Sequence, residues 1–159
     1  MAKQKLNIIV KSYPKRRFEN EFKEYGKHAS ALAEKVNKKS TTTSIHIKNG
    51  KSSKQFKKVM EHEVGHAIID KTQMCNKFSN KEKQNIRELA KQLYGKNREY
   101  NKEKPKEQLM EGLAWIYQRS KSGTPTEKKI MRTEYSKAYD EFKKAKQKLN
   151  IKIMKRRIK

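Results

Sequence analysis

The spacing of apolar positions divides the first half of the chain into three predicted elements. Residues 5–13 (KLNIIVKSY) and residues 41–48 (TTTSIHIK) are rich in β-branched side chains, which favours strands. Between them, from Arg17 to Val36, apolar residues recur every three or four positions, which is the spacing of one helix face. We therefore expect a small N-terminal sheet with a helix between its strands.

Helical spacing runs through almost all of the second half. The expected helices extend from Ser53 to about Lys71, from Ser79 to Gly95, from Pro105 to Gly123 and from Thr124 to about Phe142. The second and the fourth begin with the spacing of a capping box. Residues 96–104 are expected to form a polar loop, and residues 143–159 a basic tail. The pattern predicts a single α+β domain over residues 1–159, with the small sheet packed on a mostly helical half.

The composition adds an unusual charge to this picture. Charged residues make up 37% of the chain and apolar residues 33%, and the net charge is +25. Such a charge favours an anionic partner: nucleic acid, an acidic protein or an anionic membrane surface. An AT-rich genome, which enriches lysine, would produce the same bias without any binding function, and both interpretations stay open.

Neither conventional export nor membrane insertion is expected. Cys75 is the only cysteine, so no disulfide can form within the chain, which suits a reducing compartment. The apolar run near the N-terminus is too short for the core of a signal peptide, and no stretch approaches a membrane span. We expect a cytoplasmic protein, or one delivered without a conventional signal peptide, and hold a phage or mobile element as one source. Nothing in the sequence indicates an oligomeric state.

The segment MEHEVGHAIID, residues 60–70, carries the clearest candidate chemistry. Residues four apart share a helix face, so His62 and His66 can direct both imidazoles at one metal ion. Catalytic zinc sites combine three protein ligands with one open position for water. Glu63, at the edge of the same face, is placed to take a proton from that water. The segment thus supplies two zinc ligands and a general base, although histidines on an apolar face are also common as ordinary core residues.

A third ligand has to come from elsewhere in the chain. No histidine follows His66, which excludes zinc sites with a downstream third histidine. The remaining candidates are carboxylates, Cys75 or a tyrosine, and Cys75 is more simply explained as a small buried residue. Glu107 and Glu111 lie four apart on one helix face, so one can bind zinc while the other accepts a hydrogen bond from a ligand histidine. The alternative explanation of this pair is a solvated first turn, where acids are favoured.

HEVGHAIID, Tyr100 and EQLMEGLA together resemble the metallopeptidase domain of the anthrax lethal factor type, a group that includes the Pro-Pro endopeptidases. The resemblance covers roughly residues 55–142. It implies that Glu107 is the third zinc ligand, that Glu111 supports the site, and that Tyr100 stabilises the oxyanion of the reaction. Asp70 also matches an acidic position of the family. The opposite assignment, with Glu111 as the ligand and Glu107 as its neighbour, stays open, although the spacing of Tyr100 favours Glu107.

Some features depart from the family or bear on its substrate. The interval from His66 to Glu107 is a little shorter than in lethal factor, family members are typically secreted, and the charge of this chain is unusually high. An aromatic residue packed on the rim of the site would also explain Tyr100. Zincins commonly hold the substrate as an added strand at the edge of a small sheet. The segment before the zinc helix, Ser44, Ile45, His46 and Ile47, is the expected substrate-binding strand, and His46 and His28 are otherwise expected to be structural or exposed.

Taken together, these features predict a zinc-dependent metalloendopeptidase that hydrolyses peptide bonds with a metal-activated water. His62, His66 and Glu107 would bind Zn²⁺, Glu63 would activate the water and Tyr100 would stabilise the oxyanion. The expected partner is a protein or peptide substrate, together with an anionic partner such as nucleic acid or an acidic protein. The alternative is a basic nucleic-acid-binding or host-interaction protein in which the zinc site is structural or vestigial.

Overall fold

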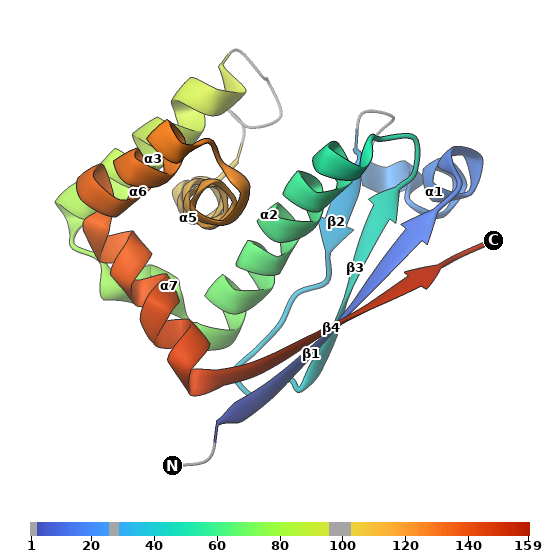
Figure 1. Ribbon diagram of the computed structural model, residues 1–159, viewed down its shortest axis with the longest axis horizontal. Helices are drawn as coiled ribbons and strands as arrows, with labels where there is room; N and C mark the ends of the chain where they lie inside the picture. The colour runs from blue at the N-terminus through green and yellow to red at the C-terminus, as the bar shows by residue number, and fades with distance from the viewer. Residues whose placement is uncertain (1–2, 26–28, 96–102) are drawn as a thin grey trace.

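A computed structural model describes residues 3–25, 29–95 and 103–159, and these residues form one sheet with most of the helices on one of its faces (Figure 1). The strands are β1 Gln4–Tyr13, β2 Ala31–Ala33, β3 Thr42–Lys48 and β4 Leu149–Arg157. The helices are α1 Lys15–Glu21, α2 Ser53–Thr72, α3 Asn80–Tyr94, α5 Pro105–Ser122, α6 Pro125–Glu134 and α7 Ser136–Lys148, with the short 3-10 helices η1 Lys23–Tyr25 and η2 Met74–Lys77. This arrangement confirms the expected α+β fold.

The four strands form a mixed sheet in the order β2-β3-β1-β4. Strand β1 runs parallel to β3 and to β4, whereas β2 is antiparallel to β3. Alternate residues on one face of the two central strands are almost fully buried, namely Leu6, Ile8, Val10, Ile45 and Ile47. Helix α2 lies along this face and contributes Ile68 and Ile69 to the same core. The sheet therefore supports the helix that carries the HEVGH segment.

Helix α5 approaches α2 closely because a glycine lies between them. A Cβ added at Gly65 would lie 3.2 Å from Tyr117 Cβ and 3.3 Å from Ala114 Cα, closer than side-chain carbons normally pack. On its other side, Gly112 packs against Ile86 of α3, where an added Cβ would meet Ile86 Cγ2 at 2.6 Å. These two close approaches fix α5 between its neighbours and set the distance from α5 to the histidines of α2.

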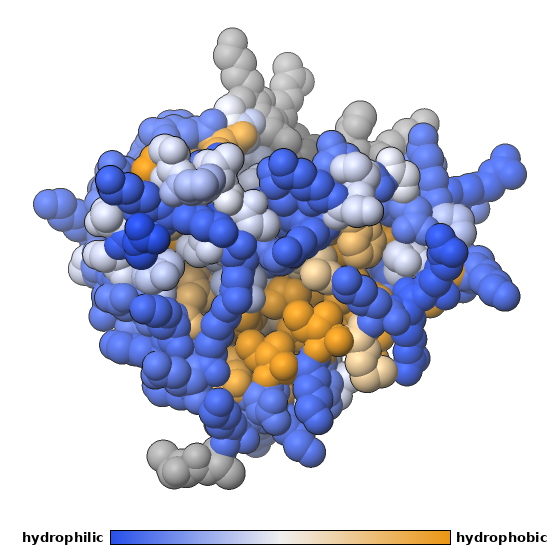
Figure 2. Space-filling model, viewed as in Figure 1, coloured by the Kyte–Doolittle hydropathy of each residue, from blue (hydrophilic) through white to orange (hydrophobic). Residues whose placement is uncertain are grey.

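The apolar residues are concentrated in the interior, so the low apolar content still builds a core. Figure 2 shows hydrophilic side chains over most of one face, with a hydrophobic patch near its centre. In the described part of the chain the large apolar residues that remain exposed are Tyr25, Ile153 and Met154. No helix among the described residues combines the length and the apolar character needed to cross a bilayer.

The expected helix from Arg17 to Val36 is wrong. Among the described residues of this range only α1 and η1 are helical, and the later part forms β2, which pairs with β3 through Leu32 and its neighbours. The apolar spacing has two separate origins. Phe18 and Phe22 pack against the Tyr13 ring, at centroid distances of 6.0 and 5.5 Å, whereas Leu32 belongs to a strand. Pairing with β3 outweighs a local spacing that happens to resemble a helix face.

Two differences concern the C-terminal part. The expected helix after Thr124 is divided at Tyr135, whose φ of −122° and ψ of 40° end α6 before α7 begins. The expected basic tail, residues 143–159, instead contains the end of α7, which reaches Lys148, and the strand β4. Strand β4 pairs in parallel with β1 over nine residues. Its Ile151 and Ile153 stand opposite Leu6 and Ile8, so the alternation of this segment extends the apolar face of the sheet.

Candidate metal centre

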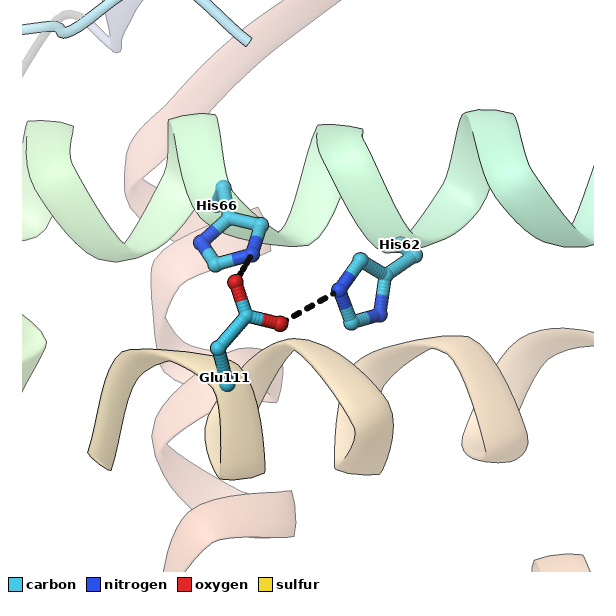
Figure 3. A group of neighbouring side chains, drawn as sticks. All are labelled: His62, His66 and Glu111. Atoms are coloured by element: carbon cyan, nitrogen blue, oxygen red, sulfur yellow. Dashed lines mark hydrogen bonds and ion pairs between the residues drawn. The ribbon is translucent and has the colours of Figure 1, made fainter. Parts of the chain in front are cut away.

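Three side chains from two helices converge on one point (Figure 3). His62 and His66 project from α2, and Glu111 projects from α5 between them. Glu111 Oε2 lies 3.0 Å from His62 Nε2, and Glu111 Oε1 lies 3.0 Å from His66 Nε2. One potential ligand atom from each residue lies within 4.8 Å of the other two. These three residues form a group that can hold a metal ion.

The charges of the group depend on one another. Burial raises the pKa of the Glu111 carboxyl, but hydrogen bonds with His62 and His66 and their positive charge outweigh it and hold that pKa well below its usual value. Burial lowers the pKa of His66, but the hydrogen bond and negative charge of Glu111 outweigh it and raise that pKa to about 9. Without a metal, the carboxylate therefore stabilises a protonated His66, and a metal ion would have to displace that proton.

Glu63 lies beside this group and lines the same cavity as His62 and Glu111. The cavity has a volume of about 560 Å³ and is lined by residues of β2, α2, α3, α5 and α6, including Ala31, Val59, Glu63 and Trp115. Burial raises the pKa of the Glu63 carboxyl, and the positive charges of His66 and His62 partly counteract this. A carboxyl with a raised pKa beside a group that can hold a metal is suited to accept and return a proton.

Two aromatic residues at this site were not expected from the sequence. Tyr94, at the end of α3, donates a hydrogen bond of 2.5 Å to Glu111 Oε2. Burial, followed by the charge of Glu111, raises the pKa of the Tyr94 hydroxyl, so it remains a donor. The ring of Trp115 lies 4.9 Å from that of His62, edge to face. Trp115 is four residues after Glu111 and so shares its helix face, a signal that was available, whereas Tyr94 comes together with Glu111 only through tertiary packing.

Glu103, just before α5, adds a further acid near the centre. Burial raises the pKa of its carboxyl to about 7, and the negative charges of Glu111 and Glu107 contribute to the shift. One of its oxygens, Oε2, is buried and has no hydrogen-bond partner. The sequence pattern places this residue in a polar loop, and local spacing does not indicate that it lies near the site.

The structure brings Glu111, not Glu107, to the two histidines. Glu107 is exposed in the first turn of α5, where its Oε2 accepts a hydrogen bond from the backbone N–H of Lys104 at 3.3 Å. Pro105 at the first helical position places Glu107 at the third, where a glutamate caps the helix N-terminus. The solvated first turn therefore accounts for Glu107, and the geometry favours the assignment that kept Glu111 as the ligand. Tyr100 lies outside the described residues, and so does His28.

Asp70 connects the end of α2 to the segment before β3. Its Oδ2 accepts a hydrogen bond of 3.4 Å from the backbone N–H of Val36. Burial raises the pKa of the Asp70 carboxyl, and its negative charge is one of the contributions that raise the pKa of His66. The Asp70 carboxylate thus affects the pKa of His66, but its hydrogen bond holds the segment before β3 in place. Cys75 is buried in η2, as a small apolar residue would be.

The expected substrate-binding strand does not lie at a sheet edge. Ser44, Ile45, His46 and Ile47 belong to β3, whose two sides are already hydrogen-bonded to β1 and β2. An added strand cannot pair there, because the backbone groups are occupied. His46 is buried, with Nδ1 2.6 Å from the Tyr13 hydroxyl and Nε2 2.9 Å from Glu34 Oε1, a structural role. The strand next to α2 that does lie at the edge is β2.

Searches of protein-family models, of curated proteins and of solved structures returned no significant match for the chain. The resemblance to the lethal-factor type of metallopeptidase consequently rests on the residues of the chain itself.

Proposed function

We propose that this chain is a zinc-dependent endopeptidase, as its resemblance to the lethal-factor type of metallopeptidase implies. The observation that carries the proposal is the convergence of His62, His66 and Glu111, with Glu63 beside them on the wall of one cavity. Two imidazoles and one carboxylate are a donor set of catalytic zinc sites, which leave a fourth position open. Glu63 supplies the proton acceptor that such a site needs.

The donor atoms suit zinc in kind and in spacing. Tetrahedral zinc with bonds of about 2.0–2.1 Å separates neighbouring donor atoms by about 3.3 Å. The Glu111 oxygens lie 3.0 Å from the Nε2 atoms of His62 and His66, so a small outward movement of the Glu111 side chain makes room for the ion. Tyr94 hydrogen-bonds Glu111 and would orient it, as the partners of metal ligands commonly do.

The remaining residues would act on water and substrate. Zinc, when bound, polarises a substrate carbonyl and lowers the pKa of water. Glu63 would take the proton of the attacking water and pass it to the leaving amine nitrogen. Its raised pKa suits this exchange, because a group that acts first as base and then as acid works best with a pKa near the working pH.

Strand β2 is the proposed substrate-binding edge. The Ser30 carbonyl accepts from the Lys48 N–H and the Glu34 N–H donates to the Ser44 carbonyl, so these residues direct their backbone groups toward β3. By alternation, Ala31 and Ala33 direct theirs to the open edge. Ala31 also lines the cavity that contains Glu63. An extended peptide paired with this edge would run past the zinc ligands, held by backbone hydrogen bonds rather than by its sequence.

The test is metal-dependent hydrolysis of a peptide library by zinc-loaded protein, with Glu63→Gln as the critical variant. We expect wild type to cleave peptides and to lose activity when a chelator removes the metal. Glu63→Gln should keep one zinc per chain and lose about 10²–10⁴ in rate, the range of a general base. The matched control is Glu61→Gln, the same substitution two residues away on α2, which should retain activity. An undiminished rate in Glu63→Gln, or a wild type that binds no zinc, would refute the proposal.

A further inference from the structure

A second cavity lies at the C-terminal end of α2, away from the metal-binding group. It has a volume of about 430 Å³ and forms where the start of β1, the end of α2 and the junction of α7 with β4 meet (Figure 1). Six lysines line it, namely Lys3, Lys38, Lys71, Lys77, Lys144 and Lys148. We refer to it as the lysine cavity. Its lining comes from segments far apart in the sequence, so the fold, and not one basic run, assembles it.

The lysine cavity has much more positive than negative charge. Among the described residues that line it, Glu141 is the one carboxylate, against six lysines. Glu141 is 5% exposed and is already paired with Lys77 at 3.8 Å, Lys137 at 3.3 Å and Lys144 at 3.6 Å. One carboxylate shared among three ammonium groups cannot neutralise the remaining lysines. Because the wall is concave, the positive potentials of these lysines add together inside the cavity.

Lys71 is the most informative member of the group. Its side chain is buried, with the residue 4% exposed, and Nζ donates to the carbonyl oxygens of Lys38 at 2.6 Å and Ser40 at 2.5 Å. No carboxylate forms an ion pair with Lys71 among the salt bridges of the described residues. An ammonium group has three donors, so one remains for a ligand. A buried, positioned and uncompensated charge favours an anion at this wall.

The composition of the wall selects the class of anion. Ammonium groups bind phosphate as point charges, and a volume of about 430 Å³ falls within the usual range of small-molecule sites. The apolar lining consists of Met74, Ala145 and Leu149 and includes no aromatic ring. Stacking platforms for bases are therefore missing from this wall, and arginine forks are missing as well, which argues against a nucleic-acid groove.

We propose that the lysine cavity is a binding site for a small anion carrying several phosphate groups. The ligand would bridge the residue just before β1, helix α2 and helix α7, since each of these contributes at least one lysine to the wall. Because it would bind the folded chain and not the unfolded one, binding raises the melting temperature. This site is separate from the proposed peptidase centre and does not depend on it.

The test uses inorganic tripolyphosphate, measured by isothermal titration calorimetry and by thermal melting at a fixed salt concentration. The cavity variant is Lys38→Gln/Lys144→Gln/Lys148→Gln. These three residues are exposed, and Lys77 and Lys137 stay available to pair with Glu141. The control is Lys54→Gln/Lys57→Gln/Lys129→Gln, which removes the same charge from exposed positions outside the cavity. A second cavity variant, Lys148→Glu, reverses one charge without touching the partners of Glu141.

We expect one saturable site in wild type, about 10-fold or more weaker binding in both cavity variants, and little change in the control. The rise in melting temperature should follow the same order. Equal losses in the cavity and control variants would overturn the proposal, because binding would then follow the total charge. Absence of saturable binding would overturn it as well. A single-stranded oligonucleotide that binds more tightly than tripolyphosphate, and loses affinity in the cavity variants, would assign the site to nucleic acid instead.

Discussion

Replacing either member of the glutamate pair by glutamine separates the two possible third ligands. Glu111→Gln keeps the size of the side chain but removes the negative charge that lies 3.0 Å from each imidazole Nε2. Glu107→Gln removes a charge from an exposed residue whose hydrogen bond, at 3.3 Å, is to the backbone of Lys104. The two substitutions are chemically identical and four residues apart on one helix, so each serves as the control for the other.

The expected difference in zinc affinity is large. Binding free energies of about 10–16 kcal/mol for four-ligand zinc sites correspond to about 2.5–4 kcal/mol for each ligand. Loss of the Glu111 carboxylate should therefore weaken zinc binding by about 10²–10³-fold. Glu107→Gln should change it by less than about 3-fold, and glutamine can also cap a helix, so stability should fall by less than about 0.5 kcal/mol.

The assay is competition with a chromophoric chelator, together with elemental analysis of zinc in wild type, His66→Ala and the two glutamine variants. One zinc per chain in wild type and Glu107→Gln, with zinc lost from His66→Ala and Glu111→Gln, is the expected result. Loss of zinc from Glu107→Gln and retention by Glu111→Gln would refute the reasoning. Glu107 would then be the third ligand, as the family resemblance implies, and the contact of Glu111 with both histidines would belong to the metal-free state alone.

Four further predictions concern the site and the helices that support it. In chelator, the raised pKa of His66, about 9 against an unfolded value of about 6.5, contributes stability below pH 6.5 that is lost as pH rises through 9, on the order of 3 kcal/mol. Melting temperatures should fall over this range in metal-free wild type and stay level in Glu111→Gln, while zinc affinity should rise, because a ligand imidazole must be neutral. Tyr94→Phe removes the 2.5 Å hydrogen bond to Glu111 and should weaken zinc binding about 10–100-fold, measured by the same competition, and an unchanged affinity would argue against its role. Tyr100→Phe, which concerns a residue outside the described part of the chain, should keep zinc and slow peptide hydrolysis about 10²–10³-fold if its hydroxyl stabilises the oxyanion. Gly112→Ala places a Cβ 2.6 Å from Ile86 Cγ2 and closer still to the Ile86 carbonyl oxygen, so it should cost about 1–3 kcal/mol in chemical denaturation, and a neutral effect would contradict the close approach of α3 and α5.

The local features of this protein follow from the sequence because their causes lie within a few residues. Ser79 with Glu82 and Thr124 with Glu127 form capping boxes, and helices α3 and α6 begin there. His62 and His66 share a face because a helix turns once in 3.6 residues, so their common direction needs no tertiary information. The strands β1 and β3 were likewise predicted from their β-branched residues, and in the structure these residues are buried on one face of the sheet.

Which elements contact one another was determined by the tertiary structure alone. The segment around Leu32 has helical spacing but becomes the edge strand β2, because its backbone pairs with β3. Ser44 to Ile47 form a strand as predicted, yet the order of the sheet puts that strand between two others. Strand order depends on pairings between distant segments, and a local sequence pattern carries no information about those pairings.

The choice between Glu107 and Glu111 illustrates the same limit at the site. Both lie on one face of α5, so periodicity treats them alike, and the family resemblance favoured the first. The close approach of α2 and α5 at Gly65 brings the second to the histidines and leaves the first at an exposed helix end. The sequence by itself therefore determined which residues have metal-binding chemistry and which helices carry them. The packing distance between those helices, set by a glycine against Ala114 and Tyr117, decided which carboxylate completes the group.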